Sequence, residues 1–244
     1  MILTLDGIRD IKLYQNRDGY RFSVDAVLLY AFVTVKHARK IVDLGAGSGV
    51  IGLLLAKKYT RASVLLVELQ KSLFTIAEKN IRINTLENRV SALCSDIRTL
   101  QQELPSRSYD MVVANPPFRR PKSGRISVGE EKAVARHELA VNLTALAETS
   151  SHLLRERGRC YMIFHPERIL EVVDALRIHQ LEPKRLRFVH NDIRTESKIM
   201  LIEAVKEGRP GMKIEKPLYI YDSNGLYTDE VRDIYGFERS VSGQ

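Results

Sequence analysis

The sequence is poor in cysteine and has no long hydrophobic run. Its two cysteines, Cys94 and Cys160, lie in apolar stretches without the spacing of metal ligands, so we expect buried structural thiols at both positions. The six histidines are scattered and form no zinc-binding pattern. No apolar run approaches a membrane span in length, and the first residues lack a basic region followed by an apolar core. We therefore expect a cytoplasmic protein that binds neither a membrane nor a metal ion.

The rest of the composition is that of one globular domain. The chain has 244 residues, enough for a sizeable α/β domain with a full core. Its hydrophobic content of 44% and charged content of 28% are ordinary for a globular protein. No internal repeat, low-complexity segment or strong interior boundary interrupts it, so we predict a single domain over residues 1–244.

Positive charge dominates and is concentrated in one segment. The net charge is +8, which favours a polyanionic partner. Between residues 119 and 137, the two anions Glu130 and Glu131 are outnumbered by six cations: Arg119, Arg120, Lys122, Arg125, Lys132 and Arg136. Such a run is often a solvated loop. Here it begins directly after Asn115-Pro-Pro-Phe118, a candidate site described below, which favours a role in binding a phosphate backbone.

Strand-like and helix-like stretches alternate along the chain, which predicts βαβ units and a parallel sheet covered by helices. The expected helices cover residues 50–59, 70–84, 132–154 and 166–179. The expected strands cover residues 40–44, 63–67, 90–94, 109–114, 159–164, 184–190 and 198–205. In such sheets a ligand binds beyond the carboxyl ends of the strands.

Four polar residues lie at those strand ends, and we expect them to share one edge of the sheet: Asp43, Glu68, Asp96 and Asn115. Glu68 lies 19 residues beyond Gly49, a spacing suited to accepting hydrogen bonds from ribose hydroxyls. Asp96 could accept from an adenine amine, with Ile97 against the ring. The alternative for each acid is a helix cap or a solvated loop, and for Asp96 the two interpretations are equally good.

A glycine-rich turn follows the first of these strands. Gly45, Gly47 and Gly49 permit a tight turn from strand to helix and a close approach of the backbone to a ligand. Gly47, Gly49 and Gly52 also match the dinucleotide-binding fingerprint, so the glycines alone leave the class of nucleotide open. The carboxylate of Asp43 would oppose a pyrophosphate but attract a cationic amino-acid group.

The segment Asn115-Pro-Pro-Phe118 follows a buried strand. Two prolines prevent the strand or a helix from continuing, and they leave carbonyl groups free to accept hydrogen bonds. The side-chain oxygen of Asn115, the carbonyl of Pro116 and the ring of Phe118 together suit a planar group that carries an NH2. An ordinary turn is the alternative. The chemical interpretation is a site where an amine is methylated.

These motifs together resemble the class I S-adenosyl-L-methionine-dependent methyltransferases that act on amino groups. The resemblance rests on Asp43-Leu-Gly-Ala-Gly-Ser-Gly49, Glu68, Asp96 and Asn115-Pro-Pro-Phe118. It implies a Rossmann-like α/β fold, with a mostly parallel seven-stranded sheet and helices on both faces.

Further stretches are similar to the bacterial tRNA1(Val) (adenine-N6)-methyltransferase family: residues 19–29, 136–138, 203–211 and 221–227. The resemblance implies a tRNA substrate methylated on the adenine beside the anticodon of a valine tRNA. It implies an N-terminal helical segment over 1–39, a Rossmann-like core over 40–205 and a C-terminal extension over 206–244. Tyr20, Phe22 and Asp25 would close over the methionine end of the cofactor, although these residues also suit the start of an amphipathic helix.

Other functions share parts of this pattern. Enzymes with similar Asn-Pro-Pro-aromatic motifs methylate guanine in ribosomal RNA, adenine in DNA or glutamine in release factors. The glutamine enzymes carry a helical domain before the glycine loop, for which the 42 residues before Asp43 leave little room. A nicotinamide-dependent oxidoreductase would leave the Asn-Pro-Pro-Phe segment unexplained. An RNA-binding module without catalysis would not need Asp43, Glu68 and Asn115 together. The sequence leaves the oligomeric state open.

Overall fold

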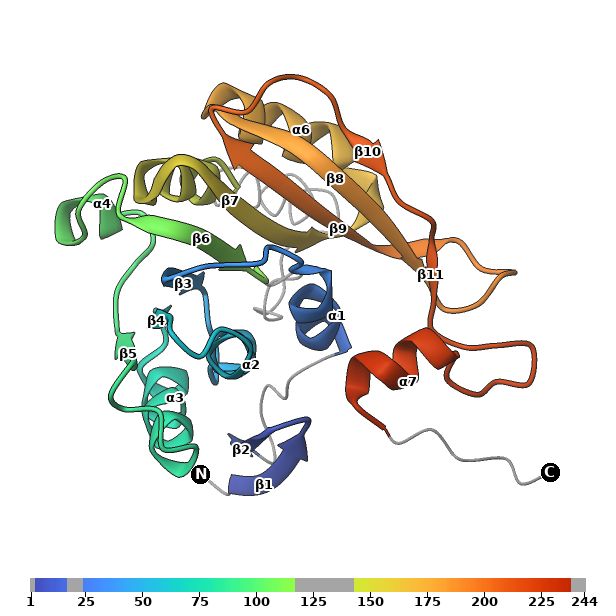
Figure 1. Cartoon of the computed structure of the whole chain (residues 1–244), viewed down its shortest axis with the longest axis horizontal. Helices are drawn as coiled ribbons and strands as arrows, with labels where there is room; N and C mark the ends of the chain where they lie inside the picture. The colour runs from blue at the N-terminus through green and yellow to red at the C-terminus, as the bar shows by residue number, and fades with distance from the viewer. Residues whose placement is uncertain (1–2, 17–23, 117–142, 238–244) are drawn as a thin grey trace, which may run out of the picture.

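The computed structural model describes residues 3–16, 24–116 and 143–237, and a nine-stranded sheet forms its centre (Figure 1). The strands lie in the order β10-β8-β9-β7-β6-β3-β4-β5, and β11 also pairs with β8. Only β9 runs antiparallel to its neighbours. The expected mostly parallel α/β sheet is confirmed. Its strands are β3 (Lys40–Leu44), β4 (Ser63–Val67), β5 (Val90–Leu93), β6 (Tyr109–Ala114), β7 (Leu154–Phe164), β8 (Leu181–His190), β9 (Ser197–Lys206), β10 (Lys213–Ile214) and β11 (Leu218–Tyr219).

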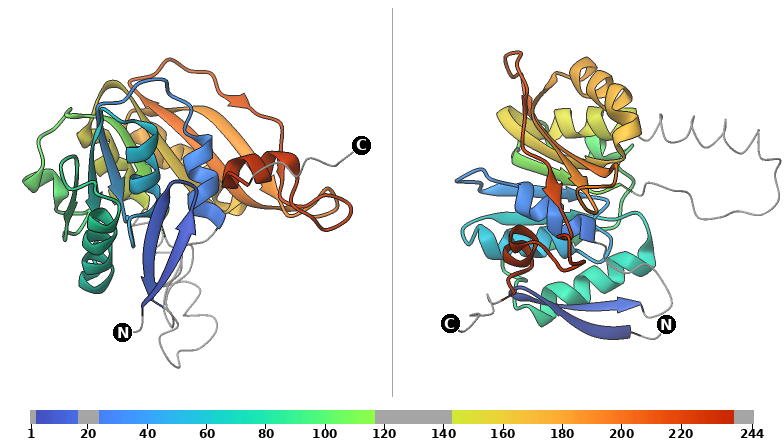
Figure 2. Two further views of the ribbon diagram at one scale, coloured as in Figure 1. Left: turned by 60° about the horizontal axis from the view of Figure 1, so that its bottom comes forward. Right: turned by 90° about the vertical axis from the view of Figure 1, so that its right-hand side faces the viewer.

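Helices cover both faces of the sheet (Figure 2). One face packs against α1 (Val24–Phe32), α2 (Val50–Lys58), α3 (Lys71–Ile83) and α7 (Asp229–Tyr235). The other face packs against α4 (Leu100–Glu103), the helical residues 143–153 and α6 (Ile169–Ile178), which follows the short 3-10 helix η1 (Pro166–Arg168). Each face therefore has its own hydrophobic core.

The central strands are apolar because both of their faces are buried. In β6, Met111 and Val113 join the core on the α2 side, whereas Val112 and Ala114 join the core on the other side. All four side chains are fully buried. This arrangement explains the continuous apolar run that predicts a parallel strand rather than an alternating pattern.

The N-terminal segment differs from the helical segment expected over 1–39. It begins with a hairpin formed by β1 (Leu3–Ile8) and β2 (Ile11–Asn16), which is separate from the main sheet. Only α1, of its described residues, is helical. A short two-stranded hairpin is marginal by itself, so its position depends on contacts with the rest of the fold.

Asn80 of α3 and Asn84, which caps the C-terminus of that helix, hold this hairpin. Asn84 accepts from the backbone N–H of Lys12 (2.9 Å) and donates to its carbonyl (2.7 Å). Asn80 makes the same pair of bonds with Tyr14 (2.6 and 3.1 Å). Residues one helical turn apart are separated by about 6 Å, and alternate residues of a strand by about 6.8 Å. The two side-chain amides are therefore spaced to bond with the backbone of alternate residues of β2, as the backbone of a neighbouring strand would.

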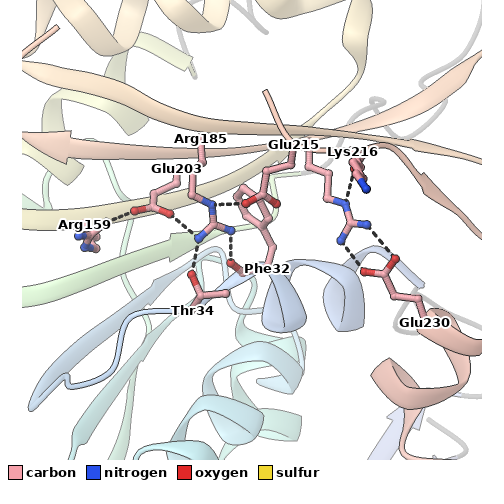
Figure 3. A network of polar contacts seen from close by, with 9 residues as sticks. Phe32, Thr34, Arg159, Arg185, Glu203, Glu215, Lys216 and Glu230 are labelled. Atoms are coloured by element: carbon pink, nitrogen blue, oxygen red, sulfur yellow. Dashed lines mark hydrogen bonds and ion pairs between the residues drawn. The ribbon is translucent and has the colours of Figure 1, made fainter. Parts of the chain in front are cut away.

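A partly buried arginine ties α1 and the C-terminal extension to the sheet (Figure 3). Arg185 on β8 lies 2.9 Å from the carboxylate of Glu203 and 3.0 Å from that of Glu215. It also donates to the carbonyl of Phe32 at 2.9 Å and to the hydroxyl of Thr34. One guanidinium group thus joins the end of α1, the strands β8 and β9, and the segment after β10.

A second arginine of the same strand secures α7. Arg187 makes two hydrogen bonds to the carboxylate of Glu230, at 2.7 and 2.9 Å, and a third to the carbonyl of Lys216 at 3.0 Å. These bonds are also drawn in Figure 3. Bidentate pairs of this kind hold their partners in a defined orientation. The C-terminal helix is therefore attached to the sheet through β8.

Several local expectations need correction. Leu154 begins β7 rather than ending the preceding helix, and the expected start of that helix lies outside the described residues. The elements β1, β2, α4, α7, β10 and β11 were not expected from the sequence. Cys160 is buried, but Cys94 is exposed because it follows the last residue of the short strand β5.

Within the described ranges, no helix is both long enough and apolar enough to cross a membrane.

We predict that Glu203→Gln destabilises the protein by about 3 kcal/mol, because it leaves two arginines without their buried countercharge. Only 1% of the Glu203 side chain is exposed, and it pairs with both Arg159 and Arg185. Urea unfolding followed by circular dichroism measures the change. Glu207→Gln is the matched control, because Glu207 pairs with a 59% exposed arginine, Arg107, and should cost less than about 1 kcal/mol. Equal costs for the two variants would contradict the role of Glu203.

Candidate active site

The carboxyl ends of four parallel strands form one edge of the sheet. Leu44 of β3 pairs with Val67 of β4 and with Ala114 of β6, and Val67 pairs with Leu93 of β5. The residues that follow these strand ends therefore lie side by side: Gly45, Glu68, Cys94 and Asn115. This arrangement brings together Glu68, Asn115 and Asp43, the penultimate residue of β3, and the fourth expected residue, Asp96, follows Leu93 by three residues.

The glycine loop is held by the neighbouring strand. The backbone N–H groups of Gly45 and Ala46 both donate to the carbonyl of Val67, each at 2.9 Å. Gly47 and Gly49 have positive φ angles of 59° and 90°, which favour glycine. A Cβ atom on Gly45 would meet no atom within 4 Å. The loop therefore presents bare backbone to open space, as a site for a closely approaching ligand requires.

Asp43 is buried beneath this loop. Its Oδ2 accepts from the backbone N–H of Gly52 in the first turn of α2, at 2.9 Å. Its Oδ1 is buried and has no hydrogen-bond partner among the described residues. Burial, opposed by the bond from Gly52 and reinforced by the nearby charge of Glu68, raises the pKa of Asp43 to about 7. An unpaired buried acceptor of this kind suits a ligand that brings a donor or a positive charge.

Close packing at Gly52 makes the Asp43 contact possible. A Cβ atom at this position would lie 2.1 Å from Leu66 Cδ2 and 3.2 Å from Asp43 Oδ2. A larger residue would push α2 away from β4 and lengthen the bond to Asp43. From the sequence, Gly52 was expected only as part of a dinucleotide-binding pattern.

Glu68 shapes the loop from the next strand. Its Oε2 accepts from the backbone N–H of Gly47 (2.9 Å), and its Oε1 accepts from that of Gln70 (2.8 Å), just before α3. The side chain is only 7% exposed. Each carboxylate oxygen has a second lone pair, so Glu68 can hold the loop and still accept from a ligand hydroxyl.

Asp96 is engaged by its own neighbour. Its carboxylate accepts from the backbone N–H of Arg98 (2.9 Å) and forms an ion pair with the Arg98 side chain. The side-chain hydrogen bond from Arg98 is the main cause of a lowered pKa at Asp96. Ile97 packs against the second core, and its carbonyl accepts from the hydroxyl of Thr149 at 2.8 Å. The expected contact of Asp96 with an adenine amine stays a prediction.

Asn115 and Pro116 lie directly beyond the end of β6 and are partly buried. Asp25 is in the first turn of α1, a helix that starts on the same side of the molecule. The remaining residues expected to bind cofactor or RNA lie outside the described residues: Tyr20, Phe22, Phe118, Arg119, Arg120, Lys122, Arg125 and Arg136. Their roles stay predictions.

Asn80 is the one residue of the described site region that sequence reasoning missed. Besides holding the hairpin, its amide donates to the carbonyl of Ser48 in the glycine loop at 2.9 Å. The side chain is fully buried. The available signal was its place on the otherwise apolar face of an amphipathic helix, four residues before Asn84.

Two further observations concern metals and cavities. Within residues 3–16, 24–116 and 143–237, no cluster of three or more histidine, cysteine or acidic side chains could hold a metal ion. A cavity of about 460 Å³ opens at the opposite, amino edge of the sheet, where Lys36, Arg39 and Arg61 are among its lining residues. It is therefore remote from the glycine loop.

The chain is similar to known proteins over most of its length. A family described as methyltransferase small domain matches residues 23–167. The tRNA1(Val) (adenine(37)-N6)-methyltransferase of Pedobacter heparinus is 29% identical over 226 residues, which cover 91% of this chain and 92% of that protein. The protein of the same name from Haemophilus influenzae strain PittEE is 26% identical over 222 residues, with 91% and 92% covered.

The fold also has solved counterparts. The crystal structure of a predicted O-methyltransferase from Agrobacterium tumefaciens superposes with a TM-score of 0.71 at 21% identity, covering 89% of this chain and 100% of that chain. At this identity the similarity shows the fold alone. It agrees with the Rossmann-like architecture of the sheet.

The raised pKa of Asp43 predicts how stability depends on pH. Its pKa of about 7 exceeds the unfolded value of 3.8, so the folded state holds the proton more tightly. The contribution of this group is complete below pH 4 and is lost as the pH rises to 7, by at most about 4 kcal/mol. Asp43→Asn removes the titration. The difference in unfolding free energy between wild type and variant, measured in urea, should therefore change between pH 4 and 7.

Asp96→Asn is the control for this experiment. The pKa of Asp96 is lowered, so its contribution is lost only below the unfolded value of 3.8, and the difference from wild type should be constant between pH 4 and 7. A constant difference for Asp43→Asn as well would show that Asp43 titrates normally.

Proposed function

The chain belongs to the methyltransferase small domain family, and we propose that it transfers a methyl group from S-adenosyl-L-methionine to the exocyclic N6 amine of an adenine in tRNA. Membership of this family confirms the expected enzyme class and cofactor. The proposed substrate is supported by relatives named for this reaction that align over about nine tenths of the chain. By the same similarity, the target would be the adenine beside the anticodon of a valine tRNA.

The described residues fit the cofactor. The buried Oδ1 of Asp43, which has no partner within residues 3–16, 24–116 and 143–237, suits the positively charged amino-acid end, directly or through a water molecule. The spare lone pairs of Glu68 suit the ribose hydroxyls. The open space above Gly45 leaves room for the part of the cofactor that links its amino-acid end to its ribose. When bound, S-adenosyl-L-methionine supplies an electrophilic methyl group on its sulfonium.

The position of Asn115 is the main support for this proposal, because Asn115 lies beside the glycine loop at the edge of the sheet. Ala114 pairs with Leu44, so Asn115 and Gly45 follow neighbouring strand ends. The amide oxygen of Asn115 and the carbonyl of Pro116 would each accept one N–H of the adenine amine. Two such bonds orient the amine and localise on nitrogen the lone pair otherwise delocalised into the ring.

Orientation then supplies much of the rate. Methyl transfer is an in-line displacement, so aligning the nitrogen with the methyl group and the sulfonium lowers the barrier. The amine held by Asn115 and Pro116 would take the methyl group from the sulfonium, and its nitrogen would then be cationic and acidic. Its proton is released to water, so no strong base is required at the site. The ring of Phe118 would stack on the extruded base.

Methylation of guanine in ribosomal RNA is the second candidate function. The acceptor pair Asn115 and Pro116 would suit the guanine N2 amine as well, because both amines are planar NH2 groups. The relatives named for adenine favour the first candidate.

Mass spectrometry distinguishes the candidates. Total tRNA and ribosomal RNA are incubated with the enzyme and labelled S-adenosyl-L-methionine, and the nucleosides are analysed. We expect the label on N6-methyladenosine from tRNA. Label on guanosine would support the ribosomal reaction, and unlabelled RNA would redirect the search to protein substrates.

We predict that Asn115→Ala lowers methyl transfer by more than about a hundredfold, because an orienting acceptor is lost. Cofactor affinity, measured by calorimetry, should persist, because the carboxylates of Asp43 and Glu68 are intact. Asn88→Ala removes an exposed asparagine before β5, at the other edge of the sheet, and should leave turnover unchanged. Turnover close to that of wild type in Asn115→Ala would refute the assignment.

The basic segment predicts a second, electrostatic effect. Replacing Arg119, Arg120 and Lys122 by alanine should weaken tRNA binding and flatten the dependence of affinity on salt, because fewer counterions are released. Fluorescence anisotropy at several salt concentrations measures both quantities. The matched triple variant replaces Lys36, Arg39 and Arg61, at the amino edge, and should retain the wild-type slope. The same slope in both triple variants would exclude the basic segment from the RNA interface.

A further inference from the structure

The C-terminal segment contains an array of four aromatic rings, formed by Tyr221, Tyr227, Tyr235 and Phe237. Neighbouring ring centroids are 5.3, 5.6 and 5.4 Å apart along this order, and the ring planes differ by only 11°, 16° and 7°. These values describe offset parallel stacking. Phe237 also lies 6.4 Å from Tyr227, with ring planes 23° apart, so Tyr227, Tyr235 and Phe237 form a triangle of rings and Tyr221 extends it at one end.

The end rings of the array are exposed. Tyr221 is 38% exposed and Phe237 is 51% exposed, whereas Tyr227 and Tyr235 between them are partly buried. Burial raises the pKa of Tyr235 to about 12, with smaller effects from Tyr227, Tyr221 and the carboxylate of Asp25. The array therefore lies beside the first turn of α1.

The array starts at the same edge of the sheet as Asn115. β11 pairs in parallel with the carboxyl end of β8, and the backbone N–H of Tyr221 donates to the carbonyl of Asn191 at 2.7 Å. Both β8 and β7 are antiparallel to β9, so β8 runs in the same direction as β6. Four strand spacings separate β11 from β6, roughly 19 Å across the sheet. The row that contains Ala114 crosses β8 at Leu186, four residues before His190, the partner of Tyr219. The span from Asn115 to the array therefore corresponds to at least about six stacked nucleotides.

Two exposed aliphatic side chains lie in the loops next to the array. Ile193, in the loop between β8 and β9, is 76% exposed, and Leu226, between Tyr221 and Tyr227, is 62% exposed. The Leu226 carbonyl accepts from Asp222 at 2.8 Å, which folds this turn back onto Tyr221. Clustered exposed apolar groups mark a surface that another molecule covers.

Electrostatics favour contact with base faces rather than with phosphates. Asp222 accepts from the backbone N–H groups of Asn224 and Leu226, and Glu230 pairs with Arg187. Arg9, a cation packed beside Gly236, donates to the backbone carbonyls of Asp233 and Ile234, so these charged groups next to the array are engaged within the protein. Unpaired bases of RNA bind to such rings through stacking, which tolerates any base.

We propose that the exposed faces of Tyr221 and Phe237 stack on unpaired bases of the RNA loop that presents the target amine. This inference rests on the proposed function, since it names how the same substrate is held beyond the reacting base. The stacked inner rings support the end rings, and the loop strand would extend from Asn115 along the carboxyl edge toward β8. The array would contribute affinity without adding to the salt dependence that the basic segment produces.

The test uses the full-length enzyme, with ring-removing and ring-keeping variants. Tyr221→Leu and Phe237→Leu remove a flat face, whereas Tyr221→Phe and Phe237→Tyr keep it. Each Leu variant should raise the KM for tRNA about tenfold, with kcat, cofactor affinity and the salt slope unchanged. The ring-keeping variants and Leu170→Ala, which alters an exposed side chain on α6, should match wild type.

A direct readout does not depend on catalysis. In a hairpin RNA that carries 2-aminopurine at single loop positions, stacking on a ring quenches the fluorescence. We expect quenching at one or more loop positions with wild type and its loss in the Leu variants. If wild type methylates no RNA, the proposed function fails, but ring-dependent quenching would still support this surface.

Three outcomes would overturn the inference. Unchanged KM and quenching in the Leu variants would show that the rings do not touch RNA. Lower thermal stability or cofactor affinity with an unchanged KM would show that the array only supports α1. Concentration-dependent dimers in light scattering, lost in the Leu variants, would show that a second copy of the chain covers the rings.

Discussion

The hydrogen-bond register of the parallel strands is the constraint on which the rest of the structure depends. Because Leu44, Val67, Leu93 and Ala114 end their strands in one row, the residues after them must share an edge. A slip of one residue would move Asn115 away from Gly45 and exchange the two buried faces of β6 between the two cores. The acceptor pair, the glycine loop and Glu68 are therefore one consequence of sheet pairing. No separate interaction is needed to bring them together.

Polar contacts of high sequence separation then place the segments outside the sheet. Asn80 links α3 to both the hairpin and the glycine loop, while Arg185 links the end of α1 to β8, β9 and the C-terminal extension. These side-chain hydrogen bonds and ion pairs hold segments that have few backbone hydrogen bonds to the main sheet. Arg187 attaches α7 to β8 in a similar way, and α7 contacts α1, which brings Tyr235 near Asp25 in the first turn of α1.

The central sheet was predictable because its signal is local. Apolar runs such as Tyr109–Ala114 and the glycine turn after Asp43 are read from neighbouring residues, and parallel pairing then places the strand ends. The hairpin and α7 were missed because their stability comes from Asn84, Arg187 and other residues far away in the chain. The role of Asp96 could not be predicted for a different reason. The sequence favoured a ligand contact and a local turn equally, and in the structure the carboxylate of Asp96 pairs with the side chain of Arg98. The exposure of Cys94 likewise follows from the shortness of β5.

The sequence by itself determined the fold class, the glycine loop, the order of the acids along the edge and the acceptor character of Asn115 and Pro116. These features depend on short-range periodicity, backbone geometry and functional-group chemistry, all of which are written in consecutive residues. Only the tertiary structure decided that Asp43 Oδ1 is buried without a partner among the described residues and that Glu68 holds the glycine loop. It also decided that four rings from the C-terminal segment stack at the edge that carries Asn115. The physical reason is that burial and stacking are properties of contacts between distant segments, which exist only after the sheet has set their positions.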